Sequence, residues 1–293
     1  MRDVFLKEKL FNLRNFSLTC GLEIFNYDDV LLPLLHRMSN VEELFLNIAI
    51  NRHYPYESFI DENTLKNDII DHLPKLNQFV FNIHSNIEHD NYLFHLSSFN
   101  DDIRNTSKDI ENNPIVSYIH YFPKENVSQY HIYSYPYQID TLHRLTNSFP
   151  GGLFQFVHHV SLFDEYPFEH EFFIRISQAF PYLQTLKIKN DSPQNNKQQQ
   201  QHQQLIIKYP HLTRLDFYDC HQDYVQEFLD EYRTHLPEQT ILDVAYCTLR
   251  RVTNNFTRPS TRINCKKIRL PYKIHKDNFP DHCYHYLPHV KIF

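Results

Sequence analysis

The sequence predicts an α/β fold in which short strands and helices alternate along one domain of 293 residues. First, an apolar pattern of the type Leu-x-x-Leu-x-Leu recurs, and six of the nine steps between its copies are 25–29 residues long. Second, segments with the apolar spacing of a helix lie between many of these copies. A recurring unit of about 20–50 residues is typical of a solenoid. We therefore expect a curved right-handed solenoid with short parallel strands on its concave face and helices on its convex face.

The clearest copy of the pattern lies at residues 212–220 and reads Leu-x-x-Leu-x-Phe-x-x-Cys. In a strand, alternate side chains point to opposite faces, so the apolar positions line the core and the residues between them face outward. This predicts that Leu212, Leu215 and Phe217 are core residues. Cys220, at the ninth position, is expected to be a buried structural thiol.

The other elements follow from the same two periodicities. Strands are expected at residues 13–18, 41–46, 76–81, 116–121, 157–162, 183–188, 239–247, 265–270 and 290–293. Helices are expected at residues 27–38, 60–73, 92–103, 139–149, 169–180 and 224–232. Pro74 and Pro181 each end a helix two residues before a strand pattern begins, because proline cannot continue a helix.

Two regions depart from the regular pattern. Residues 85–150 form an irregular middle, where two alternating segments, 115–122 and 129–135, flank the turn-forming residues 123–126. This predicts an inserted hairpin. Residues 190–204 are rich in glutamine and predict a polar surface loop, whose role the sequence leaves open.

Composition excludes several classes of function. Hydrophobic residues make up 41% of the chain and the net charge is -6, which favours a folded protein and gives no support to a nucleic-acid partner. The chain has three glycines, too few for a phosphate-binding loop. No apolar run approaches the length of a membrane span or of a signal-peptide core. The five widely spaced cysteines predict reduced thiols, and hence a cytoplasmic or nuclear protein.

The units of helix, Pro-x-Leu and strand resemble the leucine-rich-repeat region of F-box-like intracellular proteins. The Pro-x-Leu step precedes the strand at Pro74/Leu76, Pro181/Leu183 and Pro210/Leu212. The resemblance implies a substrate-receptor role in a ubiquitin ligase. No F-box motif is recognised in this chain, and the sequence leaves open whether an N-terminal adaptor-binding domain is missing.

The expected strands predict a binding surface, because the side chains at their second, third and fifth positions would line the concave face of a solenoid. The charge along this face runs from acidic to basic, which would orient a protein partner of mixed charge. The candidate partner-binding residues are Glu42, Glu43, Phe45, His158, His159, Lys187, Arg214, Asp216, Lys266 and Arg269.

The alternative is a metal-dependent or hydrolytic enzyme. His282, Cys283 and His285 are the weak candidate for a metal site, because zinc is held by histidine and cysteine ligands at short spacing, but no second well-spaced pair accompanies them. His158 and His159 lie close to Ser161, yet no orienting group can be assigned. We therefore expect a protein-binding scaffold that is not an enzyme, has no cofactor, and binds neither nucleic acid nor membrane. The partner and the oligomeric state stay open.

Overall fold

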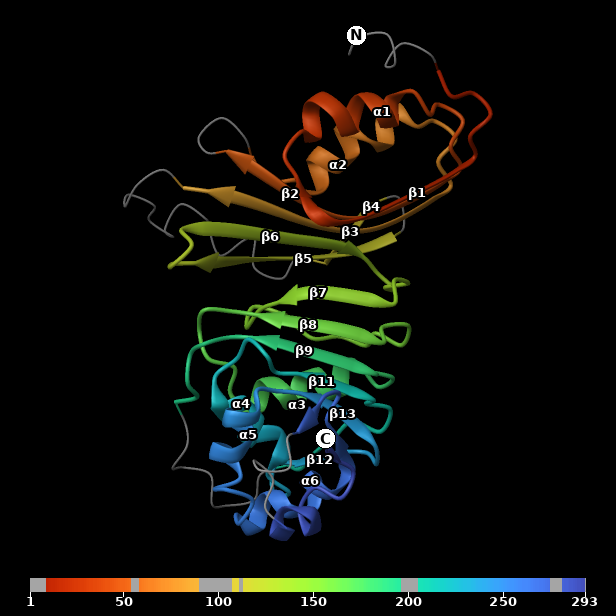
Figure 1. The fold of residues 1–293 in the computed structure, drawn as a ribbon. Coiled ribbons are helices and arrows are strands. Elements are labelled where there is room, and N and C mark those ends of the chain that lie inside the picture. The colour runs from red at the N-terminus through yellow and green to blue at the C-terminus, as the bar shows by residue number, and fades with distance from the viewer. Residues whose placement is uncertain are drawn as a thin grey trace. The chain divides into compact units, whose positions relative to one another are not determined.

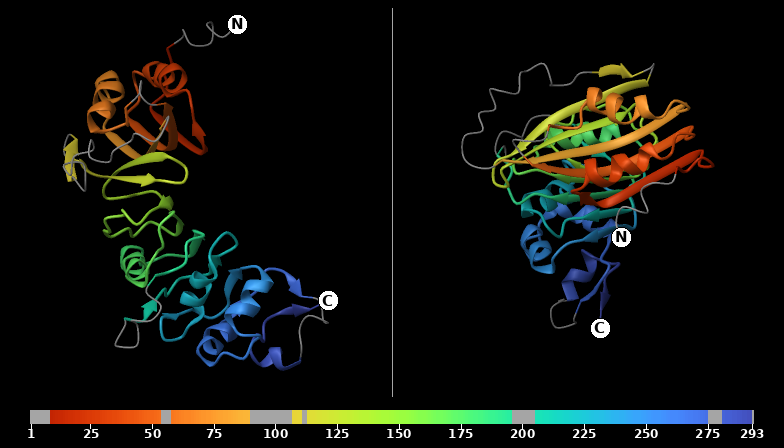
Figure 2. Two further views of the ribbon diagram at one scale, coloured as in Figure 1. Left: turned by 90° about the vertical axis from the view of Figure 1, so that its left-hand side faces the viewer. Right: turned by 90° about the horizontal axis from the view of Figure 1, so that it is seen from above.

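The computed structural model describes residues 9–53, 58–89, 107–110, 113–195, 205–274 and 281–292. The chain divides into two compact units, Met1–Tyr137 and Gln138–Phe293, each built on a six-stranded sheet. Figure 1 labels the elements, and Figure 2 gives two further views.

The sheet of the first unit is mixed. Its strand order is β1-β2-β3-β6-β5-β4, in which β1, β2 and β3 run parallel and the remaining pairings are antiparallel. The strands are β1 (Asn15–Ile24), β2 (Glu43–His53), β3 (Gln78–Glu88), β4 (Ser107–Ile110), β5 (Asn113–Phe122) and β6 (Val127–Ser134).

Helices cover one face of this sheet (Figures 1 and 2). They are η1 (Tyr27–Leu31), α1 (Leu32–His36), α2 (Glu62–Asp68) and η2 (Ile70–His72). Leu35 and Leu65 from the helices pack with Leu46 and Ile83 from the strands in one buried cluster. The alternation of apolar and polar residues along β2 is the reason, since every second side chain points to the helices.

The prediction of a leucine-rich-repeat solenoid is wrong. A solenoid would stack its strands in parallel along the chain, whereas β3 pairs with β6 antiparallel, from Asn82 opposite Tyr133 to Glu88 opposite Val127. The predicted hairpin exists as β5 and β6, but it is part of the sheet and not an insertion. Both of its strands carry apolar side chains on the helix side, among them Ile115 and Ile132. The hairpin therefore extends the sheet edge and reverses the strand direction.

The sheet of the second unit is parallel throughout. Its order is β14-β13-β11-β9-β8-β7. The strands are β7 (Thr141–Leu145), β8 (His159–Phe163), β9 (Thr185–Lys189), β11 (Arg214–Asp216), β13 (Thr240–Asp243) and β14 (Ile268–Arg269).

Helices pack on one face of this second sheet (Figure 1). They include α3 (His170–Ala179) and α4 (Gln222–Leu229). Phe173 of α3 and Phe217, which follows β11, both contact the ring of Phe228 in α4, with centroid separations of 5.2 Å in each case. The predicted core residues Leu212, Leu215 and Phe217 are buried, whereas Cys220 is only partly buried.

Shorter elements complete the second unit. They are β10 (Ile207–Lys208), β12 (Thr234–His235), α5 (Tyr246–Val252), η5 (Pro259–Thr261), α6 (Arg262–Lys267), β15 (Lys273–Ile274), η7 (Asp281–His285) and β16 (Lys291–Ile292). The last expected strand, at 290–293, corresponds to β16, which pairs with β15 and not with the six-stranded sheet.

Two expected elements differ locally, and a third is not tested. Residues 139–149 hold strand β7 and not a helix, because a register shift between Leu142 and Leu145 puts both leucines on the buried face of a strand despite their helical spacing. Residues 262–267 form α6, so the strand expected at 265–270 is limited to β14. The helix expected at 92–103 lies outside the described residues.

Candidate functional site

The second sheet exposes the face that its helices do not cover. We define the open face by the side chains that alternate with the buried positions of these strands. Figure 1 shows the strands that carry it. It consists of Thr141, His159, Ser161, Phe163, Thr185, Lys187, Lys189, Arg214, Asp216, Ile241, Asp243 and Arg269, each partly or well exposed.

The strand register brings these residues into rows. His159, Thr185 and Arg214 are direct neighbours on β8, β9 and β11, and Ser161, Lys187 and Asp216 form the next row. Directly opposed side chains in a sheet lie close enough to interact. The register therefore brings together four of the predicted partner-binding residues, His159, Lys187, Arg214 and Asp216. On β14, Arg269 pairs in register with Ile241.

Two ion pairs cross between strands on the open face. Lys187 Nζ lies 3.3 Å from Asp216 Oδ2, and Arg214 Nη2 lies 2.6 Å from Asp243 Oδ2. The cationic side chains are 48% and 50% exposed. Because exposed ion pairs contribute only about 0–1 kcal/mol to stability, these two hold side chains in place more than they hold the fold together.

Two cations contact the ring of Phe163, an aromatic residue of the open face. The guanidinium of Arg144 is 4.5 Å from the ring centroid of Phe163, and Lys189 Nζ is 5.4 Å from it. Both distances suit cation–π contacts. Lys189 and Arg269 are exposed, and neither forms an ion pair within the part of the chain that the structure describes.

The serine of this face is paired with a histidine that the sequence did not indicate. Ser161 Oγ lies 3.4 Å from His143 Nδ1 and accepts a hydrogen bond from the Arg144 N–H at 3.0 Å. Burial and the neighbouring His159 lower the pKa of His143. Among the described contacts no carboxylate is hydrogen bonded to His143, so the orienting group of a catalytic triad is missing from them.

The remaining predicted partner-binding residues lie elsewhere. Glu42, Glu43 and Phe45 belong to the first unit, where Glu42 pairs with Arg14, and Glu43 accepts a hydrogen bond from Asn15 at 2.9 Å. His158 immediately precedes β8, and Lys266 lies on helix α6 and not on a strand. The candidates thus fall into two separate groups.

The candidate metal ligands differ in their exposure to solvent. Cys283 is buried and His285 is exposed, while the side chain of His282 is outside the described set. Across the described residues, no group of three His, Cys, Asp or Glu side chains is placed to hold a metal ion.

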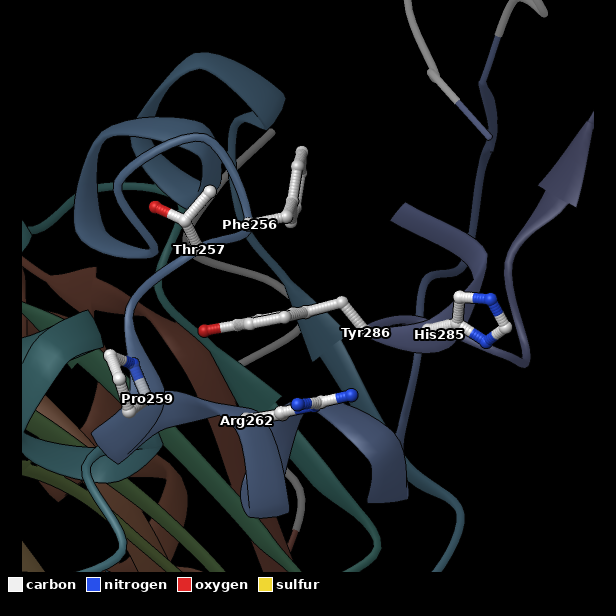
Figure 3. Close-up of a pocket in the computed structure, with 6 residues that line it drawn as sticks. All are labelled: Phe256, Thr257, Pro259, Arg262, His285 and Tyr286. Carbon is white, nitrogen blue, oxygen red and sulfur yellow. The ribbon is translucent and has the colours of Figure 1, made fainter. Parts of the chain in front are cut away.

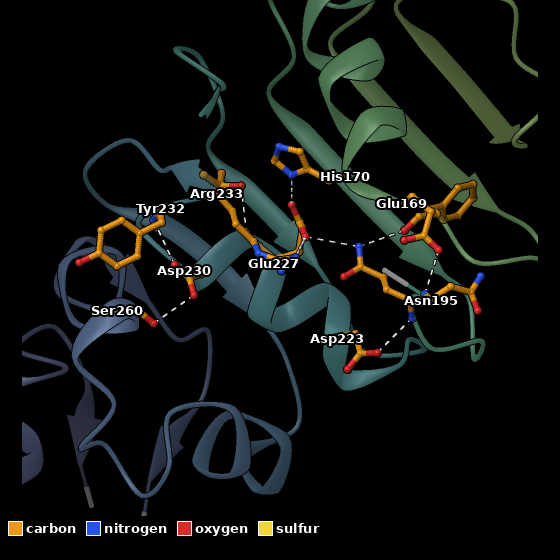
Figure 4. A network of polar contacts seen from close by, with 12 residues as sticks. Glu169, His170, Asn195, Asp223, Glu227, Asp230, Tyr232, Arg233 and Ser260 are labelled. Carbon is orange, nitrogen blue, oxygen red and sulfur yellow. Dashed lines mark hydrogen bonds and ion pairs between the residues drawn. The ribbon is translucent and has the colours of Figure 1, made fainter. Parts of the chain in front are cut away.

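A buried ionic network, which sequence reasoning missed, lies in the second unit (Figure 4). Glu227 of α4 accepts hydrogen bonds from His170 Nδ1 and from Arg233 Nη1, both at 2.5 Å. Glu227 is completely buried and His170 almost so. Burial alone would raise the pKa of Glu227, but His170 and Arg233 outweigh it and hold this pKa below its usual value.

The charge state of His170 follows from its two partners. Nδ1 faces the Glu227 carboxylate, and Nε2 lies 3.0 Å from the carbonyl oxygen of Leu205. Both partners only accept hydrogen bonds, so both ring nitrogens must carry a proton and the ring is a cation. Burial lowers the pKa of His170, but the Glu227 carboxylate raises it more, and the pKa lies above its usual value.

The same network holds the predicted Gln-rich loop, residues 190–204, on both sides of its glutamine run. In the first part of the loop, the N–H of Gln194 donates to Asp223 at 3.0 Å and the N–H of Asn195 donates to Glu169 at 2.9 Å. After the loop, the carbonyl of Leu205 contacts His170. The signal available in the sequence was a glutamate within the apolar stripe of the helix at 224–232.

The first unit contains a buried chain of neutral hydrogen bonds. His131 Nδ1 lies 2.7 Å from the Tyr118 hydroxyl, His131 Nε2 lies 2.6 Å from Asn82 Oδ1, and Asn82 Nδ2 donates to Asn47 at 2.9 Å. Every group in this chain has a suitable partner when the Tyr118 hydroxyl donates to a neutral His131 and His131 donates to the side-chain oxygen of Asn82. Burial, with a smaller effect of His84, holds the pKa of His131 well below its usual value.

The fold and these sites define the class of the protein as an α/β protein with one mixed and one parallel six-stranded sheet. No family model, curated protein or solved structure matches the chain. No helix within the described residues has the length and apolar character that crossing a membrane requires.

Proposed function

We propose that this protein is a protein-binding module that uses the open face of its second sheet. One observation carries the proposal: an all-parallel sheet presents charged and aromatic side chains on a face that no described helix covers. Parallel sheets are ordinarily covered on both faces. A partner protein would supply the second cover.

The chemistry of the face indicates the partner. Lys187 and Arg214 are already paired with carboxylates, whereas Lys189 and Arg269 have no ion pair among the described residues. A partner of mixed charge, with carboxylates opposite Lys189 and Arg269, complements this arrangement and would dock in one orientation. Tyr218, which follows β11 and is 73% exposed, supplies an aromatic side chain of the kind that dominates binding energy.

We propose protein binding and no more specific role. The receptor role in a ubiquitin ligase depended on a solenoid fold, which the mixed first sheet contradicts. The enzyme alternative gains no support from the described contacts, because the histidine that contacts Ser161 is His143, through a single long hydrogen bond, and not His158 or His159.

The test uses a partner captured from cells with the wild-type chain and then purified. Reversing two charges in the Lys189→Glu, Arg269→Glu double variant should weaken binding about tenfold or more in calorimetry, because carboxylates would then face carboxylates. Tyr218→Ala should weaken binding by a similar factor through lost contact area. Both changes are at exposed positions, so the thermal midpoint should stay unchanged.

The control is Lys208→Glu, which makes a single charge reversal of the same kind at an exposed residue of β10, outside the open face. Its affinity for the partner should equal that of the wild type. Equal affinity of the double variant and the wild type would overturn the proposed binding face.

A further inference from the structure

A pocket with a volume of about 390 Å³ lies near the C-terminal end of the second unit (Figure 3). Its lining residues come from η5, α6, the end of η7 and the residues next to these elements. They are Phe256, Thr257, Pro259, Arg262, His285 and Tyr286. The lining includes two aromatic rings, one arginine and one histidine, and no carboxylate. Such a mixture of apolar walls with a few polar groups is typical of ligand sites.

The two rings of the pocket are held in place. Phe256 and Tyr286 meet edge to face, with centroids 5.9 Å apart and planes at 70°. The hydroxyl of Tyr286 donates to the carbonyl of Arg258 at 2.7 Å and also contacts Thr261. The hydroxyl is therefore occupied within the protein, and what Tyr286 offers to the pocket is its ring (Figure 3).

The loop that presents Phe256 has an unusual backbone. Asn254, Asn255 and Phe256 all have left-handed φ angles of 50°, 54° and 62°. Asparagine adopts this conformation readily, but for a bulky residue such as phenylalanine it is an outlier. The conformation of Phe256 is held by Thr253, whose Oγ1 accepts the Phe256 N–H at 3.1 Å and whose carbonyl accepts the Thr257 N–H at 3.0 Å. Strained backbone of this kind clusters at binding sites.

The stretch of sequence that supplies most of the lining residues is basic, although the whole chain is acidic. Residues 244–274 contain eight lysines and arginines and no aspartate or glutamate, whereas the net charge of the protein is -6. Arg262 lines the pocket, is exposed, and has no ion pair among the described residues. Lys266 lies one turn further along α6, so the two cations share one side of the helix and continue the positive surface beyond the pocket.

The size and charge together select the ligand. The volume suits one large side chain, and the rings of Phe256 and Tyr286 suit an aromatic one. Arg262 and Lys266 extend the positive surface past the pocket, so the ligand has negative charge next to its apolar group. An acidic peptide satisfies both conditions.

We propose that this pocket binds an aromatic side chain within an acidic segment of a partner protein, with carboxylates of that segment meeting Arg262 and Lys266. Arginine binds carboxylates through its planar fork of donors, while the pocket excludes water from the aromatic ring. The site is separate from the open face and does not depend on it.

The test is fluorescence anisotropy with labelled synthetic peptides and the full chain. The first probe is a ten-residue peptide of Asp and Glu with one central Phe. In the second probe Ala replaces the Phe, and in the third Asn and Gln replace the acids. The first should bind, and each of the others should bind about tenfold or more weakly, because each lacks one of the two required groups.

Two variants locate the binding. Arg262→Glu should lower the affinity for the first peptide about tenfold or more, because it places a carboxylate where the peptide needs a cation. His285→Trp keeps Arg262 and fills the pocket with a larger exposed side chain, and it should also reduce binding. Arg262 and His285 are both exposed, so the fold should tolerate these changes. Lys208→Glu and Lys189→Glu, both outside the pocket, should bind the peptide as the wild type does.

Three results would overturn the proposal. Equal binding of the Phe and Ala peptides would show that the pocket is not used. A single-stranded oligonucleotide that binds more tightly than the peptide and loses binding in Arg262→Glu would identify a polyanion surface instead. Absence of peptide binding at millimolar concentration would also refute it. Each result leaves the test of the open face unaffected, because that test uses a different partner and different variants.

Discussion

Each unit of this protein buries a histidine in a polar network, and the two histidines carry opposite charge states. In the first unit, one ring nitrogen of His131 accepts a hydrogen bond from the Tyr118 hydroxyl and the other donates to Asn82, so the ring is neutral. In the second, His170 donates to Glu227 and to the carbonyl of Leu205, so it is a cation. Burial disfavours the charged form of both. The difference comes from the partners, since only His170 has a carboxylate.

The networks also differ in what they join. His131 lies on β6 and connects neighbouring strands of one sheet, and so it helps to fix their register. His170 lies on α3, and Glu227, which it contacts, is 57 residues away on α4. The loss of one hydrogen bond from the neutral network of His131 leaves only an unpaired polar group. Removing a partner from the ionic network of His170 leaves an unpaired buried charge, which costs more free energy.

The largest effect is expected for Glu227→Gln. The amide cannot balance the buried charges of His170 and Arg233, so the free energy of unfolding should fall by about 3–5 kcal/mol. Chemical denaturation measures the loss. The control Glu238→Gln changes an exposed glutamate and should leave stability within about 0.5 kcal/mol of the wild type. A loss below about 1 kcal/mol for Glu227→Gln would contradict the ionic network.

A smaller effect is expected for Tyr118→Phe in the first unit. Removing the hydroxyl leaves the buried Nδ1 of His131 without its donor, which should cost about 1–3 kcal/mol. Denaturation measures this change as well. Tyr232→Phe is the matched control, because Tyr232 is 69% exposed and the same deletion there should be nearly neutral. Equal losses in the two variants would show that the Tyr118 hydroxyl has no special role.

The pH dependence should have opposite signs at the two histidines. The folded-state pKa of His170 is raised, so its stabilisation is complete below the unfolded value of about 6.5 and is lost as pH rises through the folded pKa. The folded-state pKa of His131 is lowered, so stability falls as pH drops below about 6.5, where the unfolded chain binds the proton. The two slopes lie on opposite sides of about pH 6.5, so the combined contribution of the two histidines to stability should be largest near that pH.

NMR titration of the imidazole nitrogens separates the two. His170 should remain protonated above pH 6.5 and His131 should remain neutral below it. In the variant Glu227→Gln the His170 resonances should titrate at lower pH, while those of His131 should be unchanged. Parallel titration of both histidines in the wild type would remove the contrast between the units.

The smallest effect is expected at the exposed ion pair of the open face. A double-mutant cycle on Lys187→Ala and Asp216→Ala should give a coupling energy of about 0–1 kcal/mol, because solvent screens both charges. Thermal unfolding of the four proteins measures it. Raising the salt concentration should reduce it further. A coupling as large as the loss in Glu227→Gln would mean that exposure does not distinguish the two sites.

Local sequence patterns predicted a large part of the secondary structure. The helix expected at 169–180 is α3 at His170–Ala179, and it ends just before Pro181 as the missing N–H requires. The turn expected at 123–126 lies between β5 and β6. These elements were predictable because a periodicity or a proline acts within a few residues of itself.

Other features depended on contacts between distant residues. Leu142 and Leu145 have the spacing of a helix, but pairing with β8 accommodates both in a strand through a register shift. The candidate binding residues were chosen for one continuous surface, yet Glu43 lies in the first unit and Arg214 in the second. The spacing of residues along the chain does not specify which strand edge a hairpin will join.

The sequence by itself therefore determined the α/β class, the core positions Leu212, Leu215 and Phe217, and the exposed charges that alternate with them. Only the tertiary structure decided that β6 joins β3 antiparallel, that His170 meets Glu227, and that Phe256 and Tyr286 share a pocket. Alternation and helical spacing are set by the geometry of the backbone over one or two turns. Pairings between distant residues are set by which surfaces bury the most apolar area and satisfy the most buried polar groups, and those surfaces exist only once the chain has folded.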